Sequence, residues 1–303
     1  MKKTIHLLMA CSLLILGSCK NIGFEKTKSG LEYKIIQGNG NGKKLEHGDI
    51  VKFQYKLNFK DSTIISSYTF MPAYDQVDSV GRYHDFSEFL IKMKVGDSAV
   101  SYQFFDTLQK NPQFGVPPYM NKGDKQIVYI KIIEVFKNND RKTARDLAIE
   151  DYTAEINKYK EREMNQIEKY LIEKNIKATK INNSVFVSIE KEGTGIKVDS
   201  GKVVGIKYSG SNFQGKYFDS NTDSSKQFSP HRLETFYFVA KQEGAIQGML
   251  EGITAFKKGS VGKMFIPSSM GYGPQGSGPA IKPNENLIFD IEVVEVKDQQ
   301  ERK

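Results

Sequence analysis

The stretch that decides the fold is Lys202-Val-Val-Gly-Ile-Lys-Tyr-Ser-Gly210, followed shortly by Gly215-Lys-Tyr-Phe-Asp-Ser220. The first stretch is rich in apolar and β-branched residues, which is typical of a strand, and the second follows a turn. An earlier segment, Asp49-Ile-Val-Lys-Phe-Gln-Tyr55, has the same strand character. The similarity between the two segments indicates that the chain contains two related halves.

Three further pairs of segments repeat at a separation of roughly 155–163 residues. The pairs are Ser29–Gly40 with Ser184–Gly195, Met93–Gly96 with Phe256–Gly259, and Ile127–Phe136 with Leu287–Val296. A repeat of this length in a chain of 303 residues predicts two homologous, strand-rich domains. We place them at residues 29–137 and 179–297, with a polar tail over 298–303.

Composition narrows the class of protein. With 39% hydrophobic and 26% charged residues, the chain is neither wholly disordered nor a multi-span membrane protein. The net charge of +8 is modest and spread along the sequence, so we expect no nucleic-acid partner.

The N-terminus has the pattern of an export signal. Lys2 and Lys3 precede an apolar run that is too short to span a bilayer, and Leu16-Gly-Ser-Cys19 resembles the bacterial lipobox. We predict a lipoprotein signal peptide over residues 1–18, lipidation of Cys19 and a tether over 19–28. An ordinary secretory signal is the alternative. The favoured interpretation puts the protein in the bacterial cell envelope, anchored by lipid to the outer membrane on its periplasmic or surface face.

A helical linker is predicted between the two domains, over residues 138–178. The stretch from Asn139 to Thr179 has no Gly or Pro, and its apolar residues recur with helical spacing. We favour a solvated connector that packs along one domain, because no strict 3.5-residue repeat is sustained. The alternative is a spacer or dimerisation helix, which would make the protein a homodimer.

The usual catalytic motifs are absent. The sequence has no HExxH, Walker or Gly-x-Ser-x-Gly pattern, and its four histidines are scattered. After removal of the signal peptide, Cys19 would be the one remaining cysteine. We therefore expect no metal site and no cofactor.

The C-terminal half nevertheless contains an ordered series of aromatic and glycine motifs, and their order indicates a class of protein. After Lys202–Gly210 and Gly215–Ser220 come Phe236-Tyr-Phe238, Ala245-Ile-Gln-Gly-Met249, Phe265-Ile-Pro267, Gly271-Tyr-Gly273, Ile281-Lys-Pro283 and Leu287-Ile-Phe-Asp290. From about Asn183 to Lys297 this series resembles the FKBP-type peptidyl-prolyl cis-trans isomerases. The resemblance implies a twisted antiparallel sheet around a short helix near Gly248–Phe256. The fold class would be α+β, with two FKBP-like domains joined by a long α-helix.

The resemblance also implies a set of pocket residues. The catalytic ones would be Tyr208, Phe218, Asp219, Tyr272 and Phe289, and the substrate-binding ones Phe236, Ala245, Ile246, Met249 and Ile281. Met249 stands where the family usually has Trp, and Ala245 replaces a larger aliphatic residue, so we expect a wide pocket. The loop from Ser220 to Thr235 is longer than usual in the family.

The implied activity is cis-trans isomerisation of X–Pro bonds in proline-containing or unfolded polypeptides, in support of envelope protein folding. An apolar pocket favours the twisted, less dipolar amide, so no nucleophile or cofactor is needed. Tyr272 would offer its hydroxyl to a substrate carbonyl, and Asp219 would bond within the wall or to the peptide. The N-terminal copy keeps Tyr55 but has Ile64-Ile-Ser-Ser67 in place of Phe218-Asp219. It is interpreted as a degenerate, inactive or peptide-binding domain, and a non-catalytic chaperone is the alternative function for the whole chain.

Overall fold

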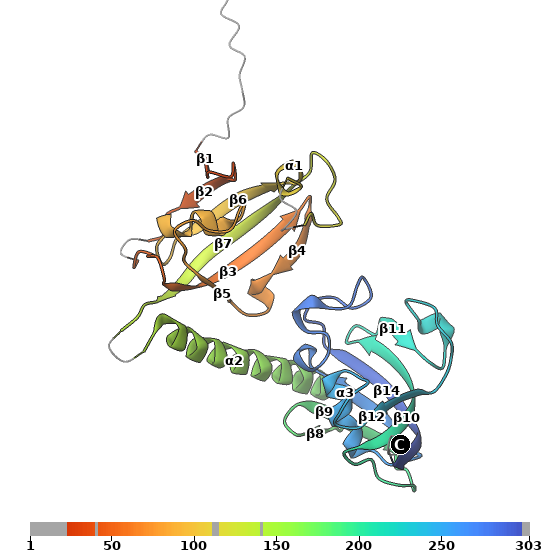
Figure 1. Cartoon of the computed structure of the whole chain (residues 1–303). Coiled ribbons are helices and arrows are strands. Elements are labelled where there is room, and N and C mark those ends of the chain that lie inside the picture. Colours follow the sequence, from red (N-terminus) through yellow and green to blue (C-terminus); the bar gives the residue numbers. More distant parts are fainter. Residues whose placement is uncertain (1–22, 40–41, 111–114, 140–141, 299–303) are drawn as a thin grey trace, which may run out of the picture.

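The computed structural model describes residues 23–39, 42–110, 115–139 and 142–298, and its strands form two seven-stranded antiparallel sheets (Figure 1). A long helix, α2 (Ala144–Glu173), connects them. The predictions of a signal peptide over residues 1–18 and of lipidation at Cys19 lie outside the described residues. Within those residues, no helix is both long enough and apolar enough to cross a membrane.

The first sheet contains β1 (Glu25–Lys26), β2 (Glu32–Ile36), β3 (Ile50–Phe59), β4 (Ser62–Ser66), β5 (Ala73–Gln76), β6 (Ser98–Phe104) and β7 (Lys125–Phe136). The second contains β8 (Thr179–Ile181), β9 (Val185–Lys191), β10 (Lys202–Asn212), β11 (Tyr217–Ser220), β12 (Phe236–Val239), β13 (Val261–Ile266) and β14 (Leu287–Asp298). The other two helices are α1 (Phe105–Leu108) and α3 (Gln247–Gly252).

The two sheets have the same topology. The first has the order β1-β2-β6-β7-β3-β4 with β5 also beside β3, and the second has β8-β9-β13-β14-β10-β11 with β12 also beside β10. Even an irregularity is repeated, because the β3–β7 register shifts at Lys52/Phe53 and the β10–β14 register at Gly205/Ile206. The sequence repeat is therefore a repeat of fold, and the predicted α+β class is confirmed.

The short helix predicted near Gly248–Phe256 is α3, which continues into a 3-10 turn at Ile253–Ala255. It packs closely on its sheet because Gly248 has no side chain: a Cβ there would lie 2.3 Å from Cγ2 of Ile266. In the first half, the corresponding segment is two 3-10 turns, Phe86–Glu88 and Leu90–Lys92.

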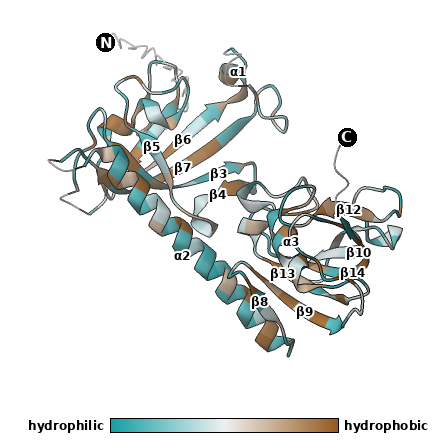
Figure 2. Cartoon of the chain, turned by 60° about the horizontal axis from the view of Figure 1, so that its bottom comes forward, coloured by the Kyte–Doolittle hydropathy of each residue, from teal (hydrophilic) through white to brown (hydrophobic). Residues whose placement is uncertain are grey.

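Helix α2 contacts both halves of the molecule, so the prediction that the linker packs along one domain is wrong. Its start is fixed by a capping box between Thr143 and Asp146. Its first half is tied to β3 by Lys52, and its second half packs apolar residues on the second sheet. The apolar group there consists of Met164, Ile167 and Leu171 from α2 with Phe186, Phe265 and Ile288 from the sheet. The figures show α2 running from one sheet to the other, with hydrophobic residues interspersed along a mainly hydrophilic helix (Figures 1 and 2). Because these residues recur with helical spacing but face two partners, the sequence pattern alone did not reveal the second contact.

Candidate functional site

A cavity of about 500 Å³ opens on the second sheet between β10, β11, β12, α3 and β14. Nine of the ten residues predicted for the pocket line it, and Gly244 completes the lining. The nine are Tyr208, Phe218, Asp219, Phe236, Ala245, Ile246, Met249, Tyr272 and Phe289. Ile281 is not among the lining residues; it is 3% exposed and belongs to the core cluster of this half.

The aromatic walls depend on the absence of a side chain at one glycine of β10. Gly210 lies on β10 opposite Asp219 on one side and Phe289 on the other. A Cβ at Gly210 would lie 2.6 Å from the ring of Phe218 and 3.0 Å from that of Phe289. Its absence lets these two rings meet edge to face, with centroids 5.6 Å apart.

The remaining walls come from β12 and from the start of α3. The ring of Phe236 meets that of Tyr208 edge to face at 5.9 Å. Ile246 is the residue before α3, and the buried Met249 lies in its first turn. The lining is thus mainly aromatic and aliphatic, and Asp219 is its one carboxylate.

Asp219 is held by three donors. The Tyr208 hydroxyl donates to its Oδ2 at 2.6 Å, the backbone N–H of Ser220 donates to its Oδ1 at 2.8 Å, and Nε2 of His231 lies 2.7 Å from the same Oδ1. Burial and the neighbouring carboxylate raise the pKa of Tyr208, so its phenol stays protonated. Asp219 therefore bonds within the pocket wall, one of the two roles that the sequence left open.

Tyr272 presents the free hydroxyl of the pocket. The residue is 38% exposed, and no hydrogen bond to its hydroxyl is found among the residues that the structure describes. Burial raises its pKa, so the hydroxyl is a neutral donor at neutral pH. It can donate to an acceptor that enters the cavity.

Sequence reasoning missed His231, which bonds the pocket carboxylate, because four scattered histidines form no recognisable motif. The long loop between Ser220 and Thr235 was the available signal, because that loop is what brings His231 back to β11. The hydrogen bond with Asp219 raises the pKa of His231. Within the described residues, no group of three or more His, Cys, Asp or Glu could hold a metal ion.

At the strand position that matches Gly210, the first half has a leucine. Leu57 on β3 pairs with Ile65 on β4 and Val128 on β7, where Gly210 pairs with Asp219 and Phe289 in the second half. The aliphatic side chain of Leu57 thus occupies the position that Gly210 leaves empty. The sequence shows that the first half lacks an equivalent of Phe218-Asp219, but it does not show that Leu57 fills the corresponding space.

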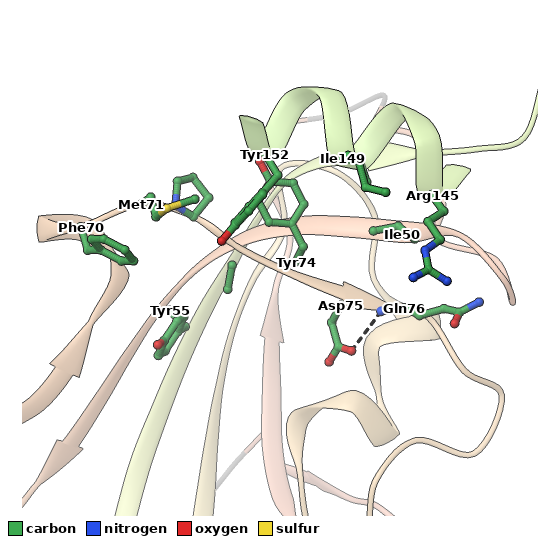
Figure 3. Close-up of a pocket in the computed structure, with 13 residues that line it drawn as sticks. Ile50, Tyr55, Phe70, Met71, Tyr74, Asp75, Gln76, Arg145, Ile149 and Tyr152 are labelled. Carbon is green, nitrogen blue, oxygen red and sulfur yellow. Dashed lines mark hydrogen bonds between the residues drawn. The ribbon is translucent and has the colours of Figure 1, made fainter. Parts of the chain in front are cut away.

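A second cavity, of about 480 Å³, lies between β5 and the first half of α2 (Figure 3). Tyr152, Ile149 and Arg145 approach it from α2, and Phe70 and Met71 border it from the segment before β5. The full lining is Ile50, Tyr55, Phe70, Met71, Pro72, Ala73, Tyr74, Asp75, Gln76, Arg145, Ala148, Ile149 and Tyr152. It is largely apolar and was not foreseen, because it needs α2 to pack on the first sheet.

Comparison with known proteins agrees with the geometry of the second half. Residues 194–294 match the family model of the FKBP-type peptidyl-prolyl cis-trans isomerases. Over 113 residues, the chain is 33% identical to an FK506-binding protein of Neisseria meningitidis serogroup A, covering 96% of that protein and 37% of this chain. The chain belongs to the FKBP-type isomerase family.

Other FKBP-type relatives are longer than the matched region. A probable FKBP-type peptidyl-prolyl cis-trans isomerase of Haemophilus influenzae is 34% identical over 129 residues, which is 43% of this chain and 48% of that protein. This chain thus spans about half the length of that relative. The crystal structure of the three FKBP domains of wheat FKBP73 aligns with 90% of this chain and 97% of its own, at 17% identity and a TM-score of 0.35.

Proposed function

We propose that the protein is a peptidyl-prolyl cis-trans isomerase that acts on X–Pro bonds of polypeptides in the cavity of its second half. The observation that carries the proposal is the convergence of Tyr208, Phe218, Phe236, Tyr272 and Phe289 on one cavity next to a single, fully bonded carboxylate. A proline ring and its twisted amide would fit such an apolar enclosure. The family membership supports the same activity.

The chemistry needs only this pocket. Rotation about an X–Pro bond breaks amide conjugation and meets a barrier of about 18–20 kcal/mol. The twisted amide is less dipolar than the planar one, so an apolar and water-poor cavity favours it over the ground state. The Tyr272 hydroxyl would hold the substrate carbonyl, and each ~1.4 kcal/mol removed from the barrier gives about a tenfold rate increase. Met249 and Ala245 would leave the pocket tolerant of bulky residues before proline.

The test is an isomerisation assay with the full chain and a short X–Pro peptide. We expect acceleration over the uncatalysed exchange, which takes roughly 10–100 s at 25 °C. The proposal is contradicted if the chain shows the circular dichroism spectrum of a folded protein but does not accelerate the exchange.

For the cellular setting, we propose a lipid anchor at Cys19 and clients among proteins folding in the bacterial envelope. The lipobox-like Leu16–Cys19 supports the anchor. In a bacterial host, labelled fatty acid should be incorporated into the wild-type chain and not into Cys19→Ser. Equal labelling of both chains would rule out this anchor.

A second candidate function is non-catalytic holding of apolar peptide segments by the first half. The apolar cavity between β5 and α2 favours it. Ile149 (53% exposed) lines that cavity, and Ile172 (80% exposed) lies on the same helix outside it. Ile149→Lys should weaken suppression of client aggregation by the full chain, whereas the matched control Ile172→Lys should not. Equal effects of the two substitutions would argue against this function.

A further inference from the structure

The loop between β11 and β12 returns to the edge of the isomerase pocket and places His231 there. Its Nε2 lies 2.7 Å from Oδ1 of Asp219, and its Nδ1 lies 2.9 Å from the backbone oxygen of Arg232. The side chains of His231 and Asp219 are 42% and 35% exposed. The pair is therefore reachable by solvent protons while it borders the cavity.

Both neighbours of the imidazole are hydrogen-bond acceptors. A carboxylate and a carbonyl offer only lone pairs, and a neutral imidazole carries a single N–H. A neutral His231 could thus satisfy Asp219 or Arg232, but not both. The imidazolium donates to both at once, so the observed geometry fits the charged form.

The backbone of His231 also helps to anchor the loop, through the side chain of Gln227. The side chain of Gln227 accepts from the backbone N–H of His231 at 3.2 Å and donates to its backbone oxygen at 3.1 Å. Gln227 also donates to the backbone oxygen of Ser220 at 2.7 Å. The loop is therefore joined to β11 through the Gln227 side chain, through the backbone N–H of Phe228, which donates to the backbone oxygen of Phe218 at 3.1 Å, and through the ionic contact between His231 and Asp219.

The charged groups near His231 on each neighbouring element have partners of their own, apart from Asp219. From β11 it faces Asp219, whose other oxygen is bonded by the neutral Tyr208 of β10. Within the loop, Lys226 pairs with Asp223 and the guanidinium of Arg232 pairs with Glu234. Tyr272, which also lines the cavity, is neutral, and its pKa is raised by burial and in part by Asp219. Asp219 is thus the charge that decides the state of His231, and their hydrogen bond raises the pKa of the imidazole.

We propose that His231 is a positioning residue of the pocket: as an imidazolium it holds both Asp219 and the 221–235 loop in place, and its deprotonation loosens the loop and leaves the pocket carboxylate uncompensated. The inference rests on the proposed isomerase function. A carboxylate without its cation attracts water into the cavity, and this disfavours the twisted amide relative to the planar one. Activity should therefore be higher below the pKa of His231 than above it.

The isomerisation itself moves no proton, so a pH dependence near neutrality is a specific signature of this contact. We expect kcat/KM of the full chain to fall about threefold as pH rises through the His231 pKa, in the range of an exposed ion pair. His231→Gln should show the lower activity at every pH. His231→Arg, a permanent cation, should remove the pH dependence and keep the higher activity.

The matched control is His47→Gln. His47 pairs with Asp78 on the first half and is exposed like His231, so its replacement should leave the pH profile of the wild type unchanged. An unchanged profile in His231→Gln, or a wild-type profile that is flat between about pH 5 and 9, would overturn the proposal.

A titration that does not depend on activity separates this proposal from the function it rests on. In NMR spectra of the full chain, the imidazole signal that disappears in His231→Gln should titrate above the usual histidine pKa of ~6.5. It should return to the usual value in Asp219→Asn. Absence of turnover at every pH would overturn the isomerase function and the effect on rate, whereas a titration at or below the usual value would overturn the His231–Asp219 contact itself.

Discussion

At the residue scale, the polar side chains of the pocket differ in their hydrogen bonding within the described residues: the Asp219 carboxylate is bonded, and the Tyr272 hydroxyl is free. Asp219 is bonded by Tyr208, Ser220 and His231, so it belongs to the wall and stiffens it. The hydroxyl of Tyr272 has no partner among the described residues, which leaves it available to a ligand. Tyr272 is thus the residue for which removal of a single atom tests the proposed function most directly.

Tyr272→Phe should lower kcat/KM for X–Pro isomerisation by up to about tenfold, the value of one net hydrogen bond, without a change in stability. The control is Tyr237→Phe, because that hydroxyl donates to Glu295 at 2.8 Å on the same half but outside the pocket. The assay is peptide isomerisation together with urea unfolding of both variants. Equal activity of Tyr272→Phe and wild type would show that the hydroxyl does not bind the substrate.

A second residue-scale prediction concerns His84, which is 0% exposed and accepts from the backbone N–H of Phe104 through Nε2 at 3.3 Å. Burial lowers its pKa, so the folded chain keeps it neutral while the unfolded chain protonates it near pH ~6.5. Its contribution is therefore present above that pH and is lost as pH falls towards the folded pKa. His231, with a raised pKa, contributes in the opposite direction.

Urea unfolding of the full chain at about pH 7 and pH 5 checks the sign. His84→Gln should reduce the loss of stability between the two values, because glutamine does not protonate. His231→Gln should not reduce that loss. The same acid sensitivity in wild type and His84→Gln would contradict the assignment.

At the element scale, helix α2 is more than a connector, because it carries a buried carboxylate that holds the segment leading to Tyr272. Glu163 is 2% exposed and accepts from the Tyr159 hydroxyl at 2.8 Å, from the backbone N–H of Ser269 at 3.1 Å and from the Ser268 hydroxyl. The 3-10 turn at Ser268–Met270 therefore depends on a residue about 105 positions earlier in the chain.

Glu163→Ala should destabilise the protein by about 1–3 kcal/mol, since it leaves buried donors unsatisfied. It should also lower kcat/KM, because Tyr272 follows the released turn. Glu161→Ala is the matched control on the exposed face of α2. Urea unfolding and hydrogen exchange of residues 268–275 provide the measurement, and protection equal to wild type in Glu163→Ala would show that α2 does not position this segment.

At the scale of the whole molecule, the first half of α2 is attached to the first sheet by a compact charge cluster. The Nζ of Lys52, a residue that is 8% exposed, lies 2.7 Å from Asp151 and 3.1 Å from Glu155. Asp151 also accepts from the hydroxyl of Tyr74. Because the second half of α2 packs apolar residues on the other sheet, this cluster ties the two halves of the protein together.

Lys52→Met should loosen the first half of α2, because it leaves two carboxylates partly buried without their cation. We expect faster hydrogen exchange over residues 144–158 and unchanged exchange in β9–β14. Lys131→Met, an exposed substitution on β7, is the control. Unchanged exchange over 144–158 in Lys52→Met would mean that the apolar contacts alone hold the helix.

Much of this architecture could be predicted from the sequence because the relevant signals are local. Strand patterns around Lys202–Gly210 and Asp49–Tyr55, and the helical spacing after Asn139, each lie within a short window of chain. The position of α3 and nine of the pocket residues followed from the ordered motifs of the FKBP resemblance. The contact of α2 with both sheets could not be predicted, because the same apolar spacing suits one partner or two.

The sequence by itself determined the two related halves, the helix between them and the aromatic inventory of the second half, since alternation and motif order are properties of the linear chain. Only the tertiary structure decided that Gly210 leaves room for two rings, that Leu57 occupies the matching position in the first half, and that Glu163 and His231 hold the surroundings of the pocket. The roles of these four residues depend on which segments of the chain come within a few ångströms of one another. Such distances arise from sheet register, helix docking and loop path together, and no single segment of sequence contains them.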